Sequence, residues 1–309
     1  MHRGVKTDGL VISLLSAIDS SYTRGMKITI ETIDSRVSVR SYSGRGLTSD
    51  DHRVLESAIA GAGPCPFGTK PRFAVVEPDS VGDVGSGRIG TYGIIRNAPA
   101  FVVGAVKPAP FAFADFGYAL EGIVLHLTTC GLGTCWLGGT FDRTGAMAAL
   151  HLSEGELVPA ITPVGDPAER RSIIDSAVRV LAGSRKRKPW SELFFDGNFD
   201  KPLGEADAGD WAPVLEAVRK GPSASNKQPW RIVRTGPASA PTFHLFLTED
   251  RAYSNAIRGV RIQELDIGIA MRHLEAASRS LGLPGSWNRL DDLAISYDEA
   301  LEYYSSWIA

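Results

Sequence analysis

The feature that most restricts the fold of this chain is an internal repeat with a domain-sized period. The segment DFGYALEGIVLHLTTCGLGTCW, 115–136, aligns without gaps with DIGIAMRHLEAASRSLGLPGSW, 266–287. Both copies place apolar residues at helical spacing and then reach a glycine, where a left-handed C-cap is expected. A period of about 150 residues is far too long for a solenoid repeat, so we expect two related halves.

A weaker match lies upstream of each copy. VLESAIAGAGPCPFGTKPRFAVV resembles VLEAVRKGPSASNKQPWRIV, and each indicates a helix, a polar loop and a strand. We therefore divide the chain into an N-terminal extension (1–25), a first half (26–188) and a shorter second half (189–309). Two homologous halves in one chain commonly reproduce a two-fold dimer within a monomer, because an isologous interface uses the same surface twice.

Helices and strands are both predicted in each half, which indicates an α+β fold. Apolar periodicity places helices at 48–61, 113–130, 143–150, 211–220 and 263–281. Strands are predicted at FAVV and FVVGAV in the first half and at RIVR and FHLFLT in the second. We expect antiparallel or mixed sheets flanked by helices. Asp50 and Asp51 lie in the first turn of a predicted helix, where acidic groups suit the helix dipole.

The composition of the chain restricts the kinds of protein that it can be. The chain has 309 residues, is 43% hydrophobic and can bury a large core, while its net charge of −2 gives no electrostatic footprint for nucleic acid. Three cysteines, Cys65, Cys130 and Cys135, form no disulfide framework and suit a reducing cytoplasm. The apolar run 10–18 is too short to span a bilayer and precedes no A-x-A-like cleavage site. We expect a cytoplasmic protein without membrane contact, whose natural start is Met26.

Two basic segments are candidate anion-binding sites. In SRVSVRSY, the side chains of Arg36, Ser38 and Arg40 alternate along an extended segment and so point the same way. Two guanidinium groups that flank a hydroxyl form a receptor for a phosphate dianion, although a solvated edge strand has the same pattern. RKRKP is either a solvated linker or a second set of phosphate donors, from Arg185 and Arg187.

The segment GPSASNKQPW, 221–230, is rich in groups that hydrogen-bond to backbone. Its small residues let the backbone approach a flat ligand, and Asn226 offers two donors and an acceptor group. The alternative interpretation is a helix-to-strand loop closed by an Asx-type turn.

Together, SRVSVRSY, PSASNKQPW and GLGTCWLGG resemble the FMN-dependent nitroreductase family, over nearly the whole chain after Met26. The two-halved arrangement resembles a branch in which two nitroreductase-like copies are fused, forming an intramolecular pseudo-dimer. In the family, one protomer supplies R-x-S-x-R and a basic pair before a proline, and the other supplies the loop. Here the first half carries both basic segments and the second carries the loop. The resemblance therefore implies one complete FMN site per chain, in a monomer that mimics the family dimer.

The resemblance also implies a role for each matched residue. Those implied to bind the FMN phosphate are Arg36, Ser38, Arg40, Arg185 and Arg187, and those implied to close over the flavin ring are Pro222, Ser223 and Asn226. Leu137 and Gly138 would present backbone groups near flavin N5 and O4. Arg96 would lie near N1 and O2, where a cation stabilises the negative charge of reduced flavin.

The implied activity is that of an NAD(P)H oxidoreductase, which passes hydride through flavin N5 in a ping-pong cycle. Its donor would be NADH or NADPH, and its small-molecule acceptor a nitroaromatic, a quinone or a related compound. Because FMN carries the chemistry, we expect no catalytic side chain and no metal site, and we interpret His126 and His273 as packing residues. Two alternatives stay open. One is a non-catalytic FMN- or nucleotide-binding protein, and the other is a different flavin enzyme on this scaffold, such as a dehalogenase or a peptide-modifying dehydrogenase.

Overall fold

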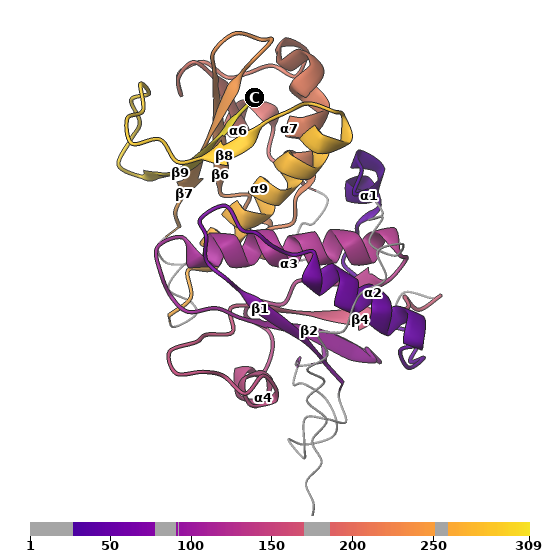
Figure 1. Cartoon of the computed structure of the whole chain (residues 1–309). Helices are drawn as coiled ribbons and strands as arrows, with labels where there is room; N and C mark the ends of the chain where they lie inside the picture. The colour runs from indigo at the N-terminus through magenta and orange to yellow at the C-terminus, as the bar shows by residue number, and fades with distance from the viewer. Residues whose placement is uncertain (1–26, 78–90, 92, 170–185, 251–258) are drawn as a thin grey trace, which may run out of the picture.

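The structure is a computed structural model that describes residues 27–77, 91, 93–169, 186–250 and 259–309. The expected N-terminal extension and Arg185 lie outside the described residues. Two β-sheets lie at opposite ends of the molecule, and two long helices, α3 (Ala112–Thr129) and α9 (Ile262–Ser280), cross between them (Figure 1). Both helices are buried along most of their length, because each packs on the other and on its own sheet.

The first sheet is antiparallel, with strand order β1-β2-β4-β3. The helices and strands up to Gly165, besides α3, are α1 (Ile30–Ser35), which packs against α7 and the central helices, α2 (Ser49–Ala60), β1 (Arg72–Val76), β2 (Ala100–Ala105), β3 (Gly133–Thr134), α4 (Arg143–Ala149) and β4 (Ile161–Gly165). Helix α2 begins with a capping box, in which the Thr48 hydroxyl accepts from the Asp51 N–H and the Asp51 carboxylate accepts from the Thr48 N–H. This arrangement confirms the predicted start of the helix, with Asp50 and Asp51 in its first turn.

The second sheet has strand order β5-β6-β7-β9-β8, with only the β5–β6 pair parallel. Its elements are α6 (Trp190–Leu193), β5 (Phe194–Asp196), a 3₁₀ helix (Ala206–Trp211), α7 (Ala212–Lys220), β6 (Trp230–Thr235), β7 (Thr242–Thr248), β8 (Ser286–Asn288) and β9 (Leu301–Ile308). Each predicted helix and strand is confirmed. The short helices α1 and α6 and the strands β3, β4, β5, β8 and β9 were not predicted from the sequence.

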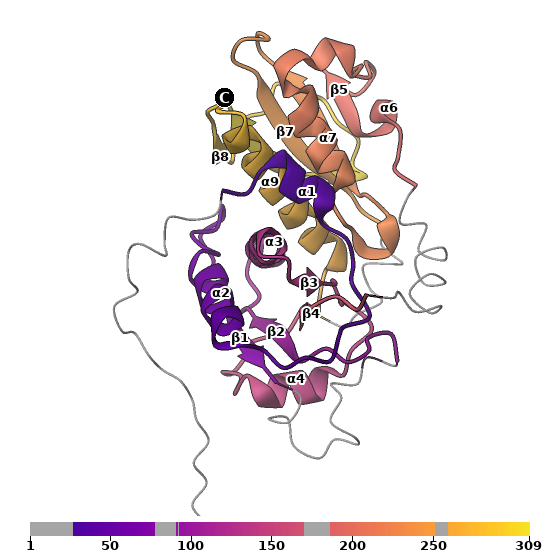
Figure 2. The same ribbon diagram turned by 90° about the vertical axis from the view of Figure 1, so that its right-hand side faces the viewer.

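The two sheets share one connectivity. In the first, a helix (α2) precedes β1 and β2, then α3 leads to β3 and β4. In the second, a helix (α7) precedes β6 and β7, then α9 leads to β8 and β9. The spatial orders β1-β2-β4-β3 and β6-β7-β9-β8 correspond strand for strand, and β5 is an additional edge strand. Figure 2 shows α2 beside α3 and α7 beside α9, on corresponding flanks of the central helices.

The matched glycines of the repeat lie where α3 and α9 cross. A Cβ atom on Gly268 would be 1.9 Å from the Ala114 carbonyl oxygen, and a Cβ on Gly117 would be 2.1 Å from the Leu265 carbonyl oxygen. Ala114 and Leu265 are themselves aligned in the repeat. Each helix therefore presents its glycine to the corresponding turn of the other, so the contact between the two helices is reciprocal.

The matched aspartates hold aligned loops. The Asp115 carboxylate accepts from the Phe67 N–H (2.9 Å), the Thr69 N–H (2.8 Å) and the Thr69 hydroxyl (2.8 Å). The Asp266 carboxylate accepts from the Ala224 N–H (3.0 Å), while its Oδ2 is buried without a hydrogen-bond partner in the described part of the chain. Burial raises the pKa of both carboxyl groups above the usual value, and that of Asp266 more strongly.

Both central helices end as the sequence predicts. Gly131 follows α3 with φ +77°, and Gly282 follows α9 with φ +72°. The next residue in each case donates its N–H back to the last turn, from Leu132 to Leu127 and from Leu283 to Ser278, both at 3.0 Å. These bonds define a Schellman-type C-cap at the same position in each half.

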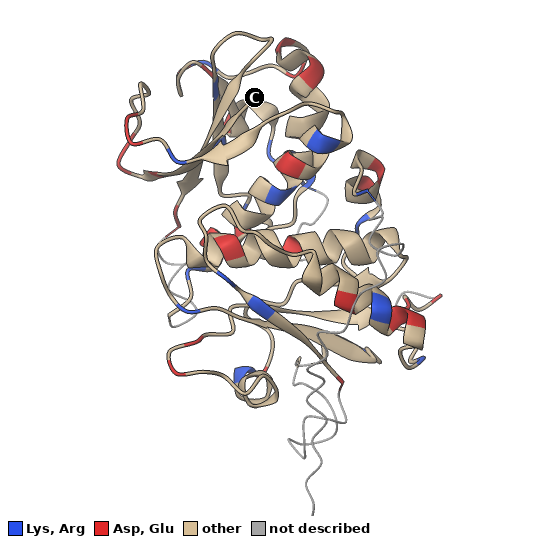
Figure 3. Ribbon diagram, in the orientation of Figure 1, with Lys and Arg blue, Asp and Glu red and all other residues tan. Residues whose placement is uncertain are grey.

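Charged side chains are interspersed over the described ribbon. Figure 3 shows lysine and arginine alternating with aspartate and glutamate on both helical layers and at the sheet edges, in keeping with the net charge of −2. Of the helices that the structure describes, none combines the length and the hydropathy needed to cross a membrane.

Candidate functional site

The R-x-S-x-R segment leaves the end of α1 in an extended conformation. Ser38 forms a parallel bridge with Thr134 of β3, and the Val39 N–H donates to the Thr134 carbonyl at 2.8 Å. On its other side, the Arg40 carbonyl accepts from the Arg96 N–H at 2.9 Å. The structure therefore brings Arg96, exposed to solvent, beside Arg40, and brings the segment beside the GLGTCWLGG strand. The family resemblance implied that residues of all three segments bind FMN.

Arg36 and Arg187 form the electrostatic centre of the site. The Arg36 side chain is 8% exposed, and its Nε is buried without a hydrogen-bond partner among the described residues. The pKa of Arg187 is lowered to about 10, mainly by burial and in addition by the neighbouring positive charges of Arg36 and Arg219. Two guanidinium groups that are desolvated and repel one another are the expected geometry of an anion site.

Arg187 is held in place by the loop that follows α7. Its guanidinium donates to the Asn226 side-chain oxygen and, at 2.8 Å, to the Lys220 carbonyl. The Asn226 amide also donates to the Lys186 carbonyl at 2.6 Å. The structure thus assigns the Asn226 side chain to positioning the basic segment, whereas the resemblance implied that it closes over a flavin ring.

The loop itself adopts a strained backbone. Ser225, Asn226 and Gln228 have φ values of +48°, +53° and +48°, in the left-handed region that non-glycine residues rarely occupy. The Ser223 hydroxyl accepts from the Gln228 N–H at 2.9 Å, and its carbonyl accepts from the Asn226 N–H at 3.0 Å. Pro222 precedes this closed turn. The hydrogen bonds of the loop fix its shape from within.

The structure differs from the sequence prediction at Leu137. Its N–H donates to the Ile161 carbonyl and its carbonyl accepts from the Ile161 N–H, both at 3.0 Å, so both backbone groups pair with the start of β4. Leu137 is also buried. The predicted backbone contact to a ligand therefore does not come from Leu137. At Gly138, an added Cβ would lie 2.8 Å from the Cδ1 atom of Ile262, at the start of α9, so a larger residue there would require the Ile262 side chain to move.

One buried residue at the site was not predicted. Glu121 on α3 is fully buried, and its carboxylate accepts from Trp136 Nε1 (2.6 Å) and bonds His273 Nε2 (2.8 Å). Arg36 Nε lies 3.9 Å from the same carboxylate. The signal in the sequence is an isolated acid within the apolar stretch YALEGIVL, because a buried carboxylate requires partners. His273 is buried as expected, but it is hydrogen-bonded to Glu121 and, at 2.8 Å, to the Ala217 carbonyl.

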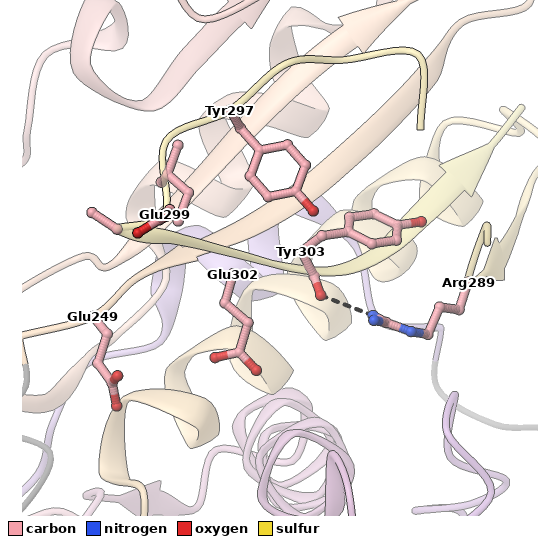
Figure 4. A pocket seen from close by; sticks show the side chains of 8 residues that line it. Glu249, Arg289, Tyr297, Glu299, Glu302 and Tyr303 are labelled. Atoms are coloured by element: carbon pink, nitrogen blue, oxygen red, sulfur yellow. Dashed lines mark hydrogen bonds between the residues drawn. The ribbon is translucent and has the colours of Figure 1, made fainter. Parts of the chain in front are cut away.

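A cavity of about 620 Å³ lies elsewhere, in the second half. Figure 4 shows its lining, which includes Glu249, directly after β7, Glu302 on β9, and the rings of Tyr297 and Tyr303. The Arg289 guanidinium donates to the Tyr303 carbonyl at 2.8 Å. None of the residues predicted to bind FMN lines this cavity. Within the described ranges, His, Cys, Asp and Glu side chains form no group of three that could hold a metal ion.

Comparison with solved structures supports the fold class. The crystal structure of a "putative nitroreductase" from Thermotoga maritima MSB8 matches 92% of this chain and 93% of its own, at 20% identity and a TM-score of 0.53. A nitroreductase family protein from Clostridium novyi NT matches 47% of this chain and 89% of its own, at 25% identity and a TM-score of 0.37. A nitroreductase with bound FMN from Bacteroides fragilis NCTC 9343 matches 47% and 90%, at 25% identity and a TM-score of 0.37.

The α+β class is thus confirmed by the described structure and by the Thermotoga neighbour. A family model described as "Putative TM nitroreductase" matches residues 28–278, which is most of the chain. The chain therefore belongs to this nitroreductase family. Membership confirms the resemblance read from the three motifs and the class of enzyme, an oxidoreductase, that the resemblance implied.

Proposed function

We propose that this chain is an FMN-dependent NAD(P)H oxidoreductase of nitroreductase type. The observation that carries the proposal is the buried Arg36 side chain beside the partly buried Arg187, where like charges repel and Arg36 Nε has no hydrogen-bond partner among the described residues. A phosphate dianion at this position would accept from both guanidinium groups and offset their repulsion. Ser38 and Arg40 continue the same extended segment and would add a hydroxyl and a third cation.

The ring of FMN would lie between the two halves of the site. Gly138 would present its backbone on the first-half side, and the loop 221–228 of the second half lies against Arg187. When bound, FMN supplies the hydride chemistry at its N5 atom. We infer that NADH or NADPH is the donor and that a nitroaromatic, a quinone or a related small molecule is the acceptor. The chain's residues bind and orient the cofactor, and Arg96 is the proposed cation near the pyrimidine end of the ring.

We further propose that 26–188 and 189–309 form a pseudo-dimer within a monomer. The shared strand order and the reciprocal contacts of Gly117 and Gly268 support this division. A symmetric arrangement would contain a second cofactor site. In the repeat, however, Arg289 aligns with Gly138, and Phe111 aligns with Ile262.

Side chains occupy the position of that second site. The Arg289 guanidinium lies 4.6 Å from the Phe111 ring centroid, and Phe67, from the loop aligned with 221–228, stacks on Phe111 with centroids 4.7 Å apart. An arginine and two aromatic rings thus stand where the other side has Gly138, Ile262 and small loop residues. This packing supports one FMN per chain.

The test is a flavin count on the full-length protein. The protein would be incubated with excess FMN and desalted, and the bound flavin would be quantified from its visible absorbance after heat release. We expect close to one FMN per chain, oxidation of NADH or NADPH that depends on an added quinone or nitroaromatic, and a monomer by sedimentation. An Arg187→Ala variant is the matched control and is expected to retain little flavin. Failure of the wild type to bind FMN would remove the proposal, and two FMN per chain would contradict the closed second site.

A further inference from the structure

We propose that Glu121 and His273 form a charge-neutral positioning pair that aims Arg36 at the phosphate of the cofactor. The inference rests on the proposed FMN site and assigns two residues that no motif of the family resemblance includes. Glu121 lies on α3 and His273 on α9, and both side chains are fully buried.

The partners of the pair fix where its proton lies. His273 Nδ1 faces the Ala217 carbonyl at 2.8 Å, and because a carbonyl only accepts, Nδ1 carries a hydrogen. His273 Nε2 faces Glu121 Oε1 at 2.8 Å, so a second proton lies between these two atoms. With that proton on His273 Nε2, the Glu121 carboxylate stays negative toward Arg36, while the pair as a whole carries no net charge. The positive charges of Arg36 and Arg187 are then left to match a phosphate dianion.

Glu121 joins the segments that surround the proposed site. Its Oε2 accepts a hydrogen bond from Nε1 of Trp136 at 2.6 Å, and Trp136 directly precedes Leu137 and Gly138 in the chain. Its Oε1 lies 3.9 Å from Arg36 Nε. His273 packs against the first residue of the loop 221–228, because a Cβ atom on Gly221 would lie 3.7 Å from His273 Nδ1. The buried Glu121 carboxylate thus interacts with Arg36 of the R-x-S-x-R segment and with Trp136 of GLGTCWLGG. Through His273 it is also linked to the start of the loop 221–228.

The distance to Arg36 explains how the pair acts. At 3.9 Å, Glu121 attracts the guanidinium without forming a hydrogen bond with Arg36 Nε, which remains available to a ligand. The carboxylate therefore sets the orientation of Arg36 through charge, and its own hydrogen bonds to Trp136 and His273 keep it in place. Replacing Glu121 by glutamine keeps the shape and a neutral pair with His273 but removes the electrostatic hold on Arg36.

The experiment compares FMN with riboflavin, which has the same ring and no phosphate. Dissociation constants for both would be measured by fluorescence titration of the wild type, Glu121→Gln and Arg36→Ala. We expect Glu121→Gln to weaken FMN binding about fivefold to tenfold and to change riboflavin binding less than about twofold. Riboflavin also reports folding, because a disrupted site would lose both ligands. His273→Gln alters the pair from the α9 side and is expected to lower the FMN preference as well.

The outcomes separate the two proposals. A wild type that binds neither flavin, or that binds both equally, overturns the proposed function. If Arg36→Ala lowers the FMN preference while Glu121→Gln and His273→Gln leave it unchanged, the FMN site stands and the positioning pair is overturned. An equal loss of FMN and riboflavin in Glu121→Gln also overturns it, because the role of Glu121 would then be structural.

Discussion

The crossing of α3 and α9 gives the most direct test of the fold. We predict that Gly268→Ala strongly destabilises the protein, because the new Cβ would lie 1.9 Å from the Ala114 carbonyl oxygen. A carbon atom approaches a carbonyl oxygen to no less than about 3.3 Å, so the helices would have to separate by more than about 1 Å. The obstructing atom is backbone within a helix and cannot rotate away. Overpacking of this kind costs about 1–3 kcal/mol, and a rigid obstruction favours the upper end.

The assay is equilibrium unfolding by urea, with thermal unfolding as a second measurement. A cost of about 3 kcal/mol corresponds to a fall in melting temperature on the order of 5–10 °C. Gly46→Ala is the matched control, because the same methyl group at Gly46 would meet no atom within 4 Å. We expect the control to change the free energy of unfolding by less than about 0.5 kcal/mol.

Gly117, which makes the corresponding contact from α3, allows a second test of whether the two glycines share one interface. Gly117→Ala, whose Cβ would lie 2.1 Å from the Leu265 carbonyl oxygen, is expected to cost about as much as Gly268→Ala. Since separating the helices for one methyl group makes room for the other, the double variant is expected to cost clearly less than the sum. Equal stability of Gly268→Ala and Gly46→Ala would refute the close crossing, and strict additivity would refute the shared interface.

Three further predictions concern single side chains. Arg40→Ala is expected to weaken FMN binding at least about tenfold in a fluorescence titration, since a phosphate contact is lost. Burial raises the pKa of Glu264 to about 7, above its ordinary 4.5, so its contribution to stability is present at low pH and lost as the pH rises through 7. Compared with Glu264→Gln, the free energy of unfolding of the wild type is expected to fall by up to about 3 kcal/mol between pH 5 and 8, as measured by urea unfolding. Asp115→Asn is expected to lower the free energy of unfolding by about 1–3 kcal/mol in the same assay, and Asp266→Asn by clearly less. The reason is that both carboxylate oxygens of Asp115 accept hydrogen bonds, whereas Asp266 Oδ2 has no hydrogen-bond partner among the described residues.

Sequence periodicity predicted the central elements because their patterns are local. Helices α3 and α9 show helical spacing and a terminal glycine, and each ends in the expected left-handed cap. Strand β9 escaped prediction since its sequence LEYYSSWI does not alternate. Ser306 is fully buried in it, and its hydroxyl is satisfied by His244 Nδ1 at 2.7 Å, a partner from β7. A shift of register between Leu245 and Phe246 further breaks the alternation that would mark an inward face.

Only the residues that lie within the recognised motifs could be assigned to the candidate site from the sequence. The sequence indicated that Arg36, Arg187 and the loop 221–228 belong together, and the structure places Arg187 against the Asn226 side chain. It could not indicate that Leu137 pairs with Ile161, because that bridge joins residues whose separation depends on the path of α4. Nor could it reveal the partners of Glu121, which come from three segments far apart in the chain.

The proposed fusion of two halves would explain why these partners can differ between the two ends of the molecule. In a homodimer, a substitution appears at both symmetric sites, so an arginine in place of Gly138 would obstruct both. In a duplicated chain, Arg289 can occupy one position and donate hydrogen bonds to the Tyr303 and Tyr304 carbonyls, while the aligned Gly138 remains a glycine. The same freedom accounts for Glu121, whose aligned residue is Arg272, a side chain that bonds the Tyr118 carbonyl. On the proposed pseudo-dimer, one end specialises in binding and the other in stability, a division that identical subunits cannot make.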